Sequence, residues 1–192
     1  MGRLSRRNLL GLSAAAVAGP SAALLAGCGD NEDTGPSPEA ELRALNGVLA
    51  LELGSIAVYG AGARLLTGSA LEASELFAEQ EREHADALEE AIEGLGGTPA
   101  SPLTDEAYRE AIGLDRLRDA DDFLHFAVDL ENGQVALAGA ALPKLGSPEL
   151  RTTVIEIVAT EAEHLAVLLG ELGEPQVPDS FVAGARARGA KP

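Results

Sequence analysis

One pattern of charged residues, present twice, constrains the fold of this 192-residue chain more than any other feature. Each copy has a lone glutamate, followed about one helix later by a Glu-x-x-His pair: Glu52 with Glu81 and His84, then Glu131 with Glu161 and His164. The two glutamates are 29 residues apart in the first copy and 30 in the second, and the two histidines are 80 residues apart. In this arrangement two helical hairpins present the ligands of two metal ions inside a four-helix bundle.

All six residues occupy positions where the sequence pattern otherwise places core residues. Around Glu52, apolar residues recur every three or four positions from Leu45 to Ala63, as on the buried face of a helix. Similar stripes surround the other five residues, over 77–95, 124–142 and 154–168. Because Glu and His three positions apart are neighbours on one helix face, each pair can direct both side chains at one ion.

Buried carboxylates need a compensating charge. An unpaired carboxylate removed from water costs several kcal/mol, and neighbouring carboxylates also repel one another. No lysine or arginine occupies the four stripes, whereas two divalent cations would balance four carboxylates and leave two neutral imidazole ligands. Mixed oxygen and nitrogen ligands favour iron or manganese, leave zinc open, and argue against a calcium cage or a thiolate site. One Glu-x-x-His pair is usually a solvated surface feature, but its repetition at core positions favours a site for two metals.

Residues 1–27 predict a signal peptide. Arg6 and Arg7 belong to a twin-arginine export signature, an apolar stretch follows, and residues 25–28 (Leu-Ala-Gly-Cys) resemble a bacterial lipobox. Cys28, the only cysteine, is then the expected lipidation site. We expect export by the twin-arginine route and a lipid anchor at the outer face of the bacterial cell membrane, with membrane lipid as partner. A plain transmembrane anchor and a buried thiol are the simpler alternatives.

The composition and the remaining segments define the rest of the chain. The net charge is −17, and loss of residues 1–27 would remove three arginines and leave −20, which excludes nucleic acid as a partner class. Residues 28–38 predict a flexible tether, residues 39–172 the helical bundle, and residues 173–192 a tail rich in proline, glycine and Ala-Arg repeats.

The helix pattern predicts an all-α fold. Four long helices are expected at about 38–66, 70–95, 119–142 and 147–172, with a short helix at 104–112 capped by Thr104. Short turns connect the first two and the last two long helices, and a long crossover joins the hairpins. Aromatic residues make up only 3 % of the chain and period-two alternation is absent, so no strand pattern competes.

These features resemble the ferritin-like di-iron carboxylate superfamily, and within it the exported bacterial ferritin-like domain proteins. The resemblance covers residues 39–172. It implies that Glu81 and Glu161 bridge two metal ions, which are iron, with manganese as an alternative. Glu52 and Glu131 are then the terminal ligands, and His84 and His164 each complete the ligand set of one ion. With a single cysteine, the chain departs from relatives that carry a rubredoxin-like cysteine cluster.

The resemblance favours a redox enzyme, a di-iron oxidoreductase or ferroxidase that reacts with dioxygen or peroxide. A lipoprotein that binds or sequesters metal without turnover is the alternative, and a third hypothesis is a protein whose metals only stabilise its core. A second copy of the chain, giving a homodimer, is a further partner that the sequence leaves open.

Three further residues are candidates for contact with the ligands. Ser55 and Gln134 follow the lone glutamates by three positions, and Tyr59 follows Glu52 by seven, where the other half has Ala138. Tyr59 can donate a hydrogen bond to a ligand or carry an electron, although packing with a satisfied hydroxyl is the commoner role. Gln134 can hold a ligand or form an ordinary interhelical hydrogen bond. Among the other residues of these helices, His125, Glu83 and Glu163 are expected to lie off the metal-facing side.

Overall fold

The computed structural model describes residues 35–178 of the chain. The predicted signal peptide, the predicted lipidation site Cys28 and most of the predicted tail lie outside the described residues. Within 35–178 the regular structure is helical, without strands. The α-helices are α2 (Pro38–Gly62), α3 (Gly68–Gly94), α4 (Asp105–Ile112), α5 (Ala120–Ala141) and α6 (Pro148–Glu171), and the 3-10 turns are η2 (Ala63–Leu65), η3 (Leu114–Arg116) and η4 (Leu142–Lys144).

Side-chain caps explain where most of these helices begin. Ser37, Asp119 and Ser147 each accept a hydrogen bond from the backbone N–H three residues later, at the starts of α2, α5 and α6. Thr104 does the same for α4, as the sequence predicts. Each cap satisfies one of the N–H groups that have no partner within the helix.

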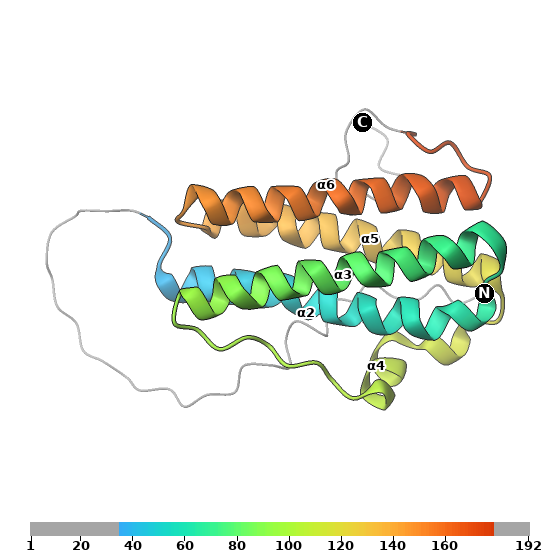
Figure 1. Ribbon diagram of the computed structural model, residues 1–192, viewed down its shortest axis with the longest axis horizontal. Coiled ribbons are helices and arrows are strands. Elements are labelled where there is room, and N and C mark those ends of the chain that lie inside the picture. Colours follow the sequence, from blue (N-terminus) through green and yellow to red (C-terminus); the bar gives the residue numbers. More distant parts are fainter. Residues whose placement is uncertain (1–34, 179–192) are drawn as a thin grey trace, which may run out of the picture.

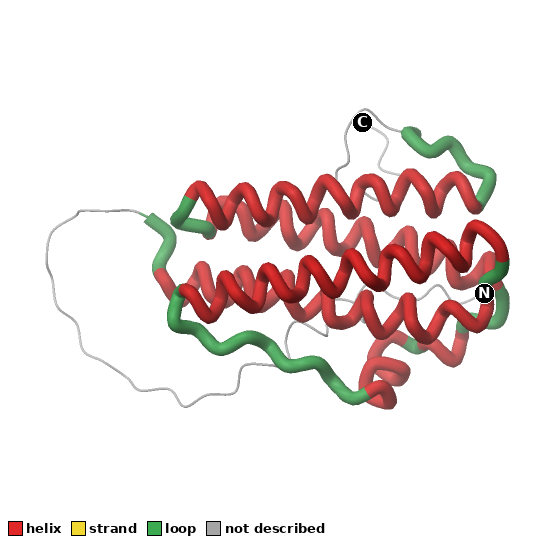
Figure 2. Tube along the Cα trace, in the orientation of Figure 1, coloured by secondary structure: helices red, strands yellow, loops and turns green. Residues whose placement is uncertain are grey.

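The four long helices form a bundle of two antiparallel hairpins (Figure 1). Helix α2 packs against α3, and α5 packs against α6. The hairpins meet through α2 with α5 and through α3 with α6. The crossover after α3 runs back along the length of the bundle and carries α4, as the tube in Figure 2 shows. The predicted all-α bundle of two hairpins joined by a long crossover is therefore confirmed.

Some predicted boundaries differ from the structure. Helix α2 ends at Gly62, and the chain continues to Leu65 only as the 3-10 turn η2. Helix α5 ends at Ala141 and is followed directly by the turn η4, which contains Pro143. Leu95, which the apolar stripe places in the core, is 41 % exposed. It lies just past α3, where the chain turns away from the bundle axis before it can complete another turn of the stripe.

A polar layer divides the bundle core into two apolar clusters. One cluster includes Tyr59, Phe77, Phe123 and Leu168, and the other includes Leu49, Leu88, Val154 and Ile157. The six Glu and His residues of the repeated pattern lie between them along all four helices. The fold thus places these polar side chains at mid-height, with apolar packing on either side.

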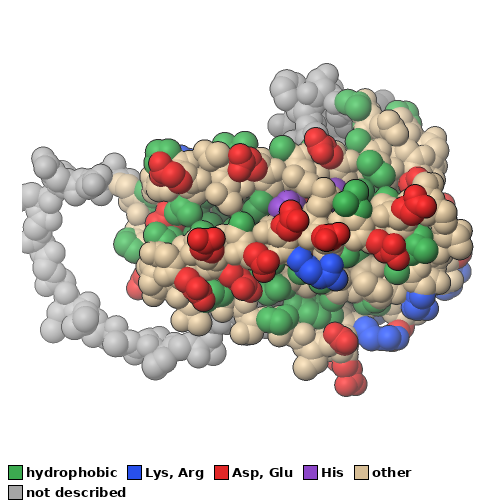
Figure 3. Space-filling model, viewed as in Figure 1, with side chains coloured by type: hydrophobic (Ala, Val, Ile, Leu, Met, Phe, Trp, Pro, Cys, Tyr) green, Lys and Arg blue, Asp and Glu red, His purple; other side chains and the backbone are tan. Residues whose placement is uncertain are grey.

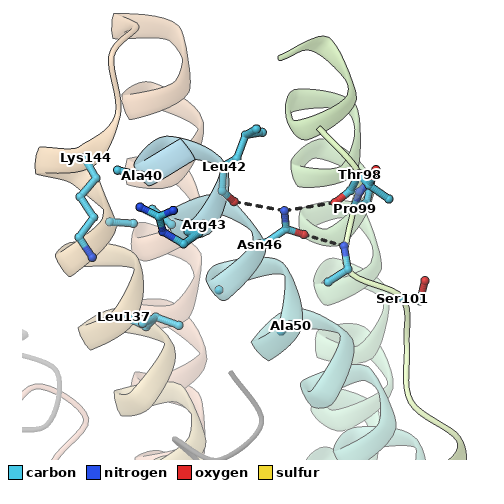
Figure 4. Close-up of a pocket in the computed structure, with 14 residues that line it drawn as sticks. Ala40, Leu42, Arg43, Asn46, Ala50, Thr98, Pro99, Ser101, Leu137 and Lys144 are labelled. Carbon is cyan, nitrogen blue, oxygen red and sulfur yellow. Dashed lines mark hydrogen bonds between the residues drawn. The ribbon is translucent and has the colours of Figure 1, made fainter. Parts of the chain in front are cut away.

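Asn46 of α2 hydrogen-bonds to the first part of the crossover. Asn46 donates from Nδ2 to the carbonyl of Thr98 (3.3 Å) and accepts from the backbone N–H of Ala100 (2.6 Å), as Figure 4 shows. These contacts border a pocket that lies between α2, the crossover and the end of α5. None of the six Glu and His residues lines this pocket.

Among the described residues, one helix is long and apolar enough to cross a membrane by length and composition alone. It is Pro38–Leu65, with a mean hydropathy of 1.4 over its most apolar window, and 56 % of that window is buried in the bundle. Since α2 packs against both α3 and α5, its apolar composition matches that of a core helix.

Alanine substitutions at two glycines near the end of α2 should have opposite effects on stability. A methyl group at Gly62 would overlap the buried Phe123 ring, whereas a methyl group at Gly60 meets nothing within 4 Å. We expect Gly62→Ala to lower the free energy of unfolding by about 1–3 kcal/mol through overpacking. The control Gly60→Ala should raise it by about 0.5–1 kcal/mol, since alanine is the better helix former. Urea unfolding of both metal-free variants checks this, and a stabilised Gly62→Ala would contradict the described packing.

Candidate metal centre

The structure brings the six residues of the repeated pattern into one cluster, which we call the Glu/His centre: Glu52, Glu81, His84, Glu131, Glu161 and His164. Each of the four long helices contributes at least one member. All four glutamates are 0 % exposed and His164 is 1 % exposed. Only His84 reaches solvent, with 13 % of its side chain exposed.

Glu81 and Glu161 occupy the middle of the Glu/His centre. Glu161 Oε1 lies 3.1 Å from Nδ1 of His84, and its Oε2 lies 3.1 Å from Nδ1 of His164. The two oxygens of Glu81 also face different histidines, with Oε2 3.9 Å from His84 Nδ1 and Oε1 3.6 Å from His164 Nδ1. Each central carboxylate therefore presents one oxygen to each imidazole.

The outer glutamates complete two groups of four side chains. Glu52 lies beside His84, with 3.5 Å between Oε2 and Nδ1, and Glu131 lies beside His164 at 3.6 Å. In each group the potential ligand atoms all lie within 4.8 Å of one another, and both groups share Glu81 and Glu161. Ligand atoms this close together can surround one ion per group, with two carboxylates common to both ions.

The hydrogen bonding of the Glu/His centre fits a metal-binding role. Five of its buried atoms make no hydrogen bond within the described part of the chain: Glu52 Oε1, Glu81 Oε1, His84 Nδ1, Glu131 Oε2 and Glu161 Oε1. Buried polar atoms without partners are rare because each costs free energy. All five are oxygen or nitrogen atoms of the kinds that bind iron, manganese and zinc.

The four carboxyls form two pairs whose pKa values shift in opposite directions. Burial raises the pKa of Glu52 and of Glu131 well above their usual range, and the neighbouring Glu81 and Glu161 add to these shifts. Burial also works against ionisation of Glu161, but close contacts with Glu131 and both histidines outweigh it and lower the pKa of this carboxyl to about 2. Close contacts with Glu52 and the histidines likewise outweigh burial and lower the pKa of Glu81.

The imidazoles balance the two ionised carboxylates. Burial disfavours a charged His84 ring, but its close contacts with the Glu161 and Glu52 carboxylates raise its pKa to about 12. Close contacts with Glu131 and Glu161 similarly outweigh burial and raise the pKa of His164 to about 11. At neutral pH the two imidazolium ions thus balance the charges of Glu81 and Glu161, while Glu52 and Glu131 hold protons more strongly than ordinary carboxyls do. Metal binding must therefore displace the protons of both imidazoles.

Tyr59 contacts the glutamate of the other hairpin. Its hydroxyl donates a hydrogen bond to Glu131 Oε1, although the spacing on α2 associates it with Glu52. Its ring packs edge-on against Phe77, with 5.7 Å between ring centroids, and burial raises the pKa of the phenol well above its usual range. Tyr59 therefore combines both roles considered from the sequence, because it is a packed core residue whose hydroxyl is satisfied by a candidate ligand.

Gln134 and Ser55 form a hydrogen-bonded pair beside Glu52 and Glu81. Gln134 Nε2 donates to Glu52 Oε2 at 3.1 Å and to Glu81 Oε2 at 3.0 Å. Ser55 Oγ donates to Gln134 Oε1 at 2.9 Å, which orients the amide. Gln134 thus contacts two candidate ligands and also links α5 to α2 and α3.

Sequence reasoning missed two residues that contact His164. Gln80 Oε1 lies 2.9 Å from His164 Nε2, and the Phe77 ring stacks on the imidazole with 3.9 Å between centroids. The available signal was weak, because Gln80 is a half-buried polar residue directly before the motif and Phe77 was assigned to the apolar stripe.

The remaining polar candidates lie outside the Glu/His centre, as expected. His125 is exposed and lies 3.7 Å from Asp121, and Glu83 and Glu163 are exposed. Figure 3 shows histidine reaching the face formed by α3 and α6, among many Asp and Glu side chains. Acidic side chains therefore predominate among the charged groups on this face.

Comparisons with known proteins agree with this fold. The family described as ferritin-like domain matches residues 40–174. A crystal structure described as ferritin-like, diiron-carboxylate proteins from Bacillus anthracis str. Ames is 24 % identical, covers 70 % of this chain and 96 % of that chain, and superposes with a TM-score of 0.59. At this identity the similarity extends to the fold. No curated protein matches the chain.

The pKa shifts predict that the metal-free protein loses stability as the pH rises from about 6 to about 9. The pKa values of Glu52, Glu131, His84 and His164 are all raised by folding, so the folded protein keeps protons that the unfolded chain releases. Their contribution is complete below the unfolded pKa values and is lost as the pH rises towards the folded ones. Thermal unfolding of chelator-treated protein at several pH values measures this slope.

Added metal should show the opposite dependence, because metal ions compete with the same protons. His125→Ala is the control and should keep the slope, since this histidine lies outside the Glu/His centre. The double variant Glu52→Gln, Glu131→Gln replaces two carboxyls of raised pKa by amides that do not titrate and should flatten the slope. An unchanged slope in the double variant would contradict the proton assignment.

Proposed function

Because the chain belongs to the ferritin-like domain family, we propose that its Glu/His centre binds two metal ions and uses them in oxygen- or peroxide-dependent redox chemistry. Iron is the proposed metal, with manganese as the alternative. The observation that carries the proposal is the pair of overlapping ligand groups, which share Glu81 and Glu161 and contain five buried atoms without hydrogen-bond partners.

The ligand set suits iron. Four carboxylates and two imidazoles are the donors expected of a pair of ions that changes oxidation state. Two iron ions held together can supply two electrons to dioxygen or peroxide, or can themselves be oxidised as substrate. The four carboxylates balance the charge of two ferrous ions, so the loaded Glu/His centre is neutral inside an apolar core.

The surrounding side chains hold these ligands in place. Tyr59 fixes one oxygen of Glu131, and Gln134 fixes one oxygen each of Glu52 and Glu81. The two apolar clusters above and below the polar layer exclude water from the carboxylates. A water-excluded site with preorganised donors strengthens electrostatic interactions at the ligands. Exposed acids on α3 and α6, including Glu83 and Glu163, make the electrostatic potential around this part of the bundle negative, which attracts cations.

Metal storage or sequestration without turnover is the second candidate function. It is favoured by the complete burial of the four glutamates and by the position of the described pocket, which no ligand candidate lines. An organic substrate has no described route to the Glu/His centre, whereas dioxygen, peroxide and metal ions are small. The two functions differ in whether the bound metal changes oxidation state when oxygen is supplied.

Metal content tests the binding step. Wild-type protein loaded with ferrous iron under nitrogen should retain about two ions per chain. Glu81→Ala and Glu161→Ala should each lose one or both ions, since each of these carboxylates faces both ligand groups. Glu83→Ala and Glu163→Ala are matched controls on the exposed side of the same helices and should keep both ions. Full iron content in Glu81→Ala or Glu161→Ala would contradict the ligand assignment.

Exposure to oxygen then separates the two functions. If the protein is a redox enzyme, the ferrous wild type mixed with air should develop ferric absorption within seconds to minutes, much faster than ferrous iron bound to Glu81→Ala. A ferrous wild type that stays colourless in air while retaining its iron would favour sequestration.

We also propose the cellular setting that the sequence predicts, namely export by the twin-arginine route and a lipid anchor on Cys28 at the outer face of the cell membrane. These residues precede α2 by a polar tether, so the anchor and the bundle are separate in the chain. Labelling with a radioactive fatty acid in a bacterial host should mark the wild type and leave Cys28→Ser unlabelled. Equal labelling of both proteins would exclude Cys28 as the lipidation site.

A further inference from the structure

The two histidines of the Glu/His centre are held in different ways. His164 lies between the Phe77 ring and the Gln80 side chain, whose Oε1 is 2.9 Å from His164 Nε2. An amide oxygen only accepts hydrogen bonds, so the Nε2 atom of a neutral His164 ring carries the proton and donates it. The Nδ1 atom is then free of a proton and faces Glu81, Glu131 and Glu161.

His84 lacks an equivalent support among the described residues. Its Nδ1 also faces the carboxylates, but no described side chain accepts a hydrogen bond from its Nε2, and its side chain is 13 % exposed. Thr160 precedes the second Glu-x-x-His motif as Gln80 precedes the first. The Thr160 hydroxyl donates instead to the Glu156 carbonyl of its own helix at 3.2 Å. The repeated motif is therefore symmetric in its ligands and asymmetric in what holds them.

We infer that Gln80 is a positioning residue that aims His164 at the Glu/His centre and makes the two metal positions unequal. The position bounded by Glu131 and His164 holds its ion more tightly, and the position bounded by Glu52 and His84 exchanges its ion with solvent. This inference rests on the proposed binding of two metals and adds the order in which they are bound.

Two physical effects act in the same direction. A ring that is already fixed loses little freedom when an ion binds, and hydrogen-bond partners of ligating histidines raise metal affinity by about 10–100-fold. In addition, the exposed side of the Glu/His centre is the His84 side, so water and competing ligands reach that ion first. His164 combines the hydrogen bond from Nε2, the stacked ring and nearly complete burial, whereas His84 has neither an acceptor for Nε2 nor a stacked ring among the described residues, and its side chain is 13 % exposed.

Cobalt(II) titration tests the inference, because cobalt absorption in the visible range reports ligand geometry. The metal-free full chain, titrated without oxygen, should bind two ions in separate steps, the first about 10–100-fold tighter than the second. Gln80→Met, which removes the acceptor, should weaken the first step by that factor and merge the two. Gln80→Glu retains an acceptor at the same place and should retain both steps. Thr160→Val is the matched control in the other half and should leave both steps unchanged.

The outcomes separate this inference from the proposed function. Two equal steps in the wild type, or an unchanged first step in Gln80→Met, would overturn the role of Gln80 while leaving metal binding intact. A wild type that binds no cobalt would contradict the proposed function itself.

Nuclear magnetic resonance of the zinc-loaded wild type gives a second measurement that needs no variant. Its His164 ring should be metal-bound through Nδ1, with a proton on Nε2 that exchanges slowly with water. A ring bound through Nε2 would overturn the inference.

Discussion

Four carboxylates buried in the middle of a helical bundle are the constraint on which the rest of this structure depends. Each would cost several kcal/mol as an isolated charge away from water, and together they repel. No lysine or arginine enters the Glu/His centre, so protons and imidazolium ions balance the charge in the metal-free protein. The same arrangement becomes neutral with two divalent ions. Apolar clusters above and below the layer keep water out and preserve these interactions.

The repeated motif produces a nearly symmetric set of ligands inside an asymmetric set of supports. Tyr59 holds Glu131, whereas the Gln134 amide holds Glu52 and Glu81. His164 is buried and stacked on Phe77, whereas the His84 side chain is 13 % exposed. Such a difference suits a site in which one metal remains bound while the other is supplied or replaced.

Burial of a glutamate does not by itself identify a ligand in this protein. Glu41 is only 8 % exposed, yet its Oε1 accepts a hydrogen bond at 2.6 Å from the backbone N–H of Gly146. That bond fastens the turn between α5 and α6 to the start of α2. The glutamates of the Glu/His centre differ because several of their oxygen atoms have no protein partner and face other ligand atoms.

The sequence by itself determined the helical class, the helix positions to within a few residues and the six polar positions at mid-core. These features are local, since apolar periodicity and caps such as Thr104 act within one helix. Only the tertiary structure decided that Tyr59 reaches Glu131 of the other hairpin and that Gln80 holds His164. It also decided that Leu95 leaves the core. These contacts depend on how the hairpins pack and where the chain turns away, and spacing along one helix does not encode the distance to its neighbours.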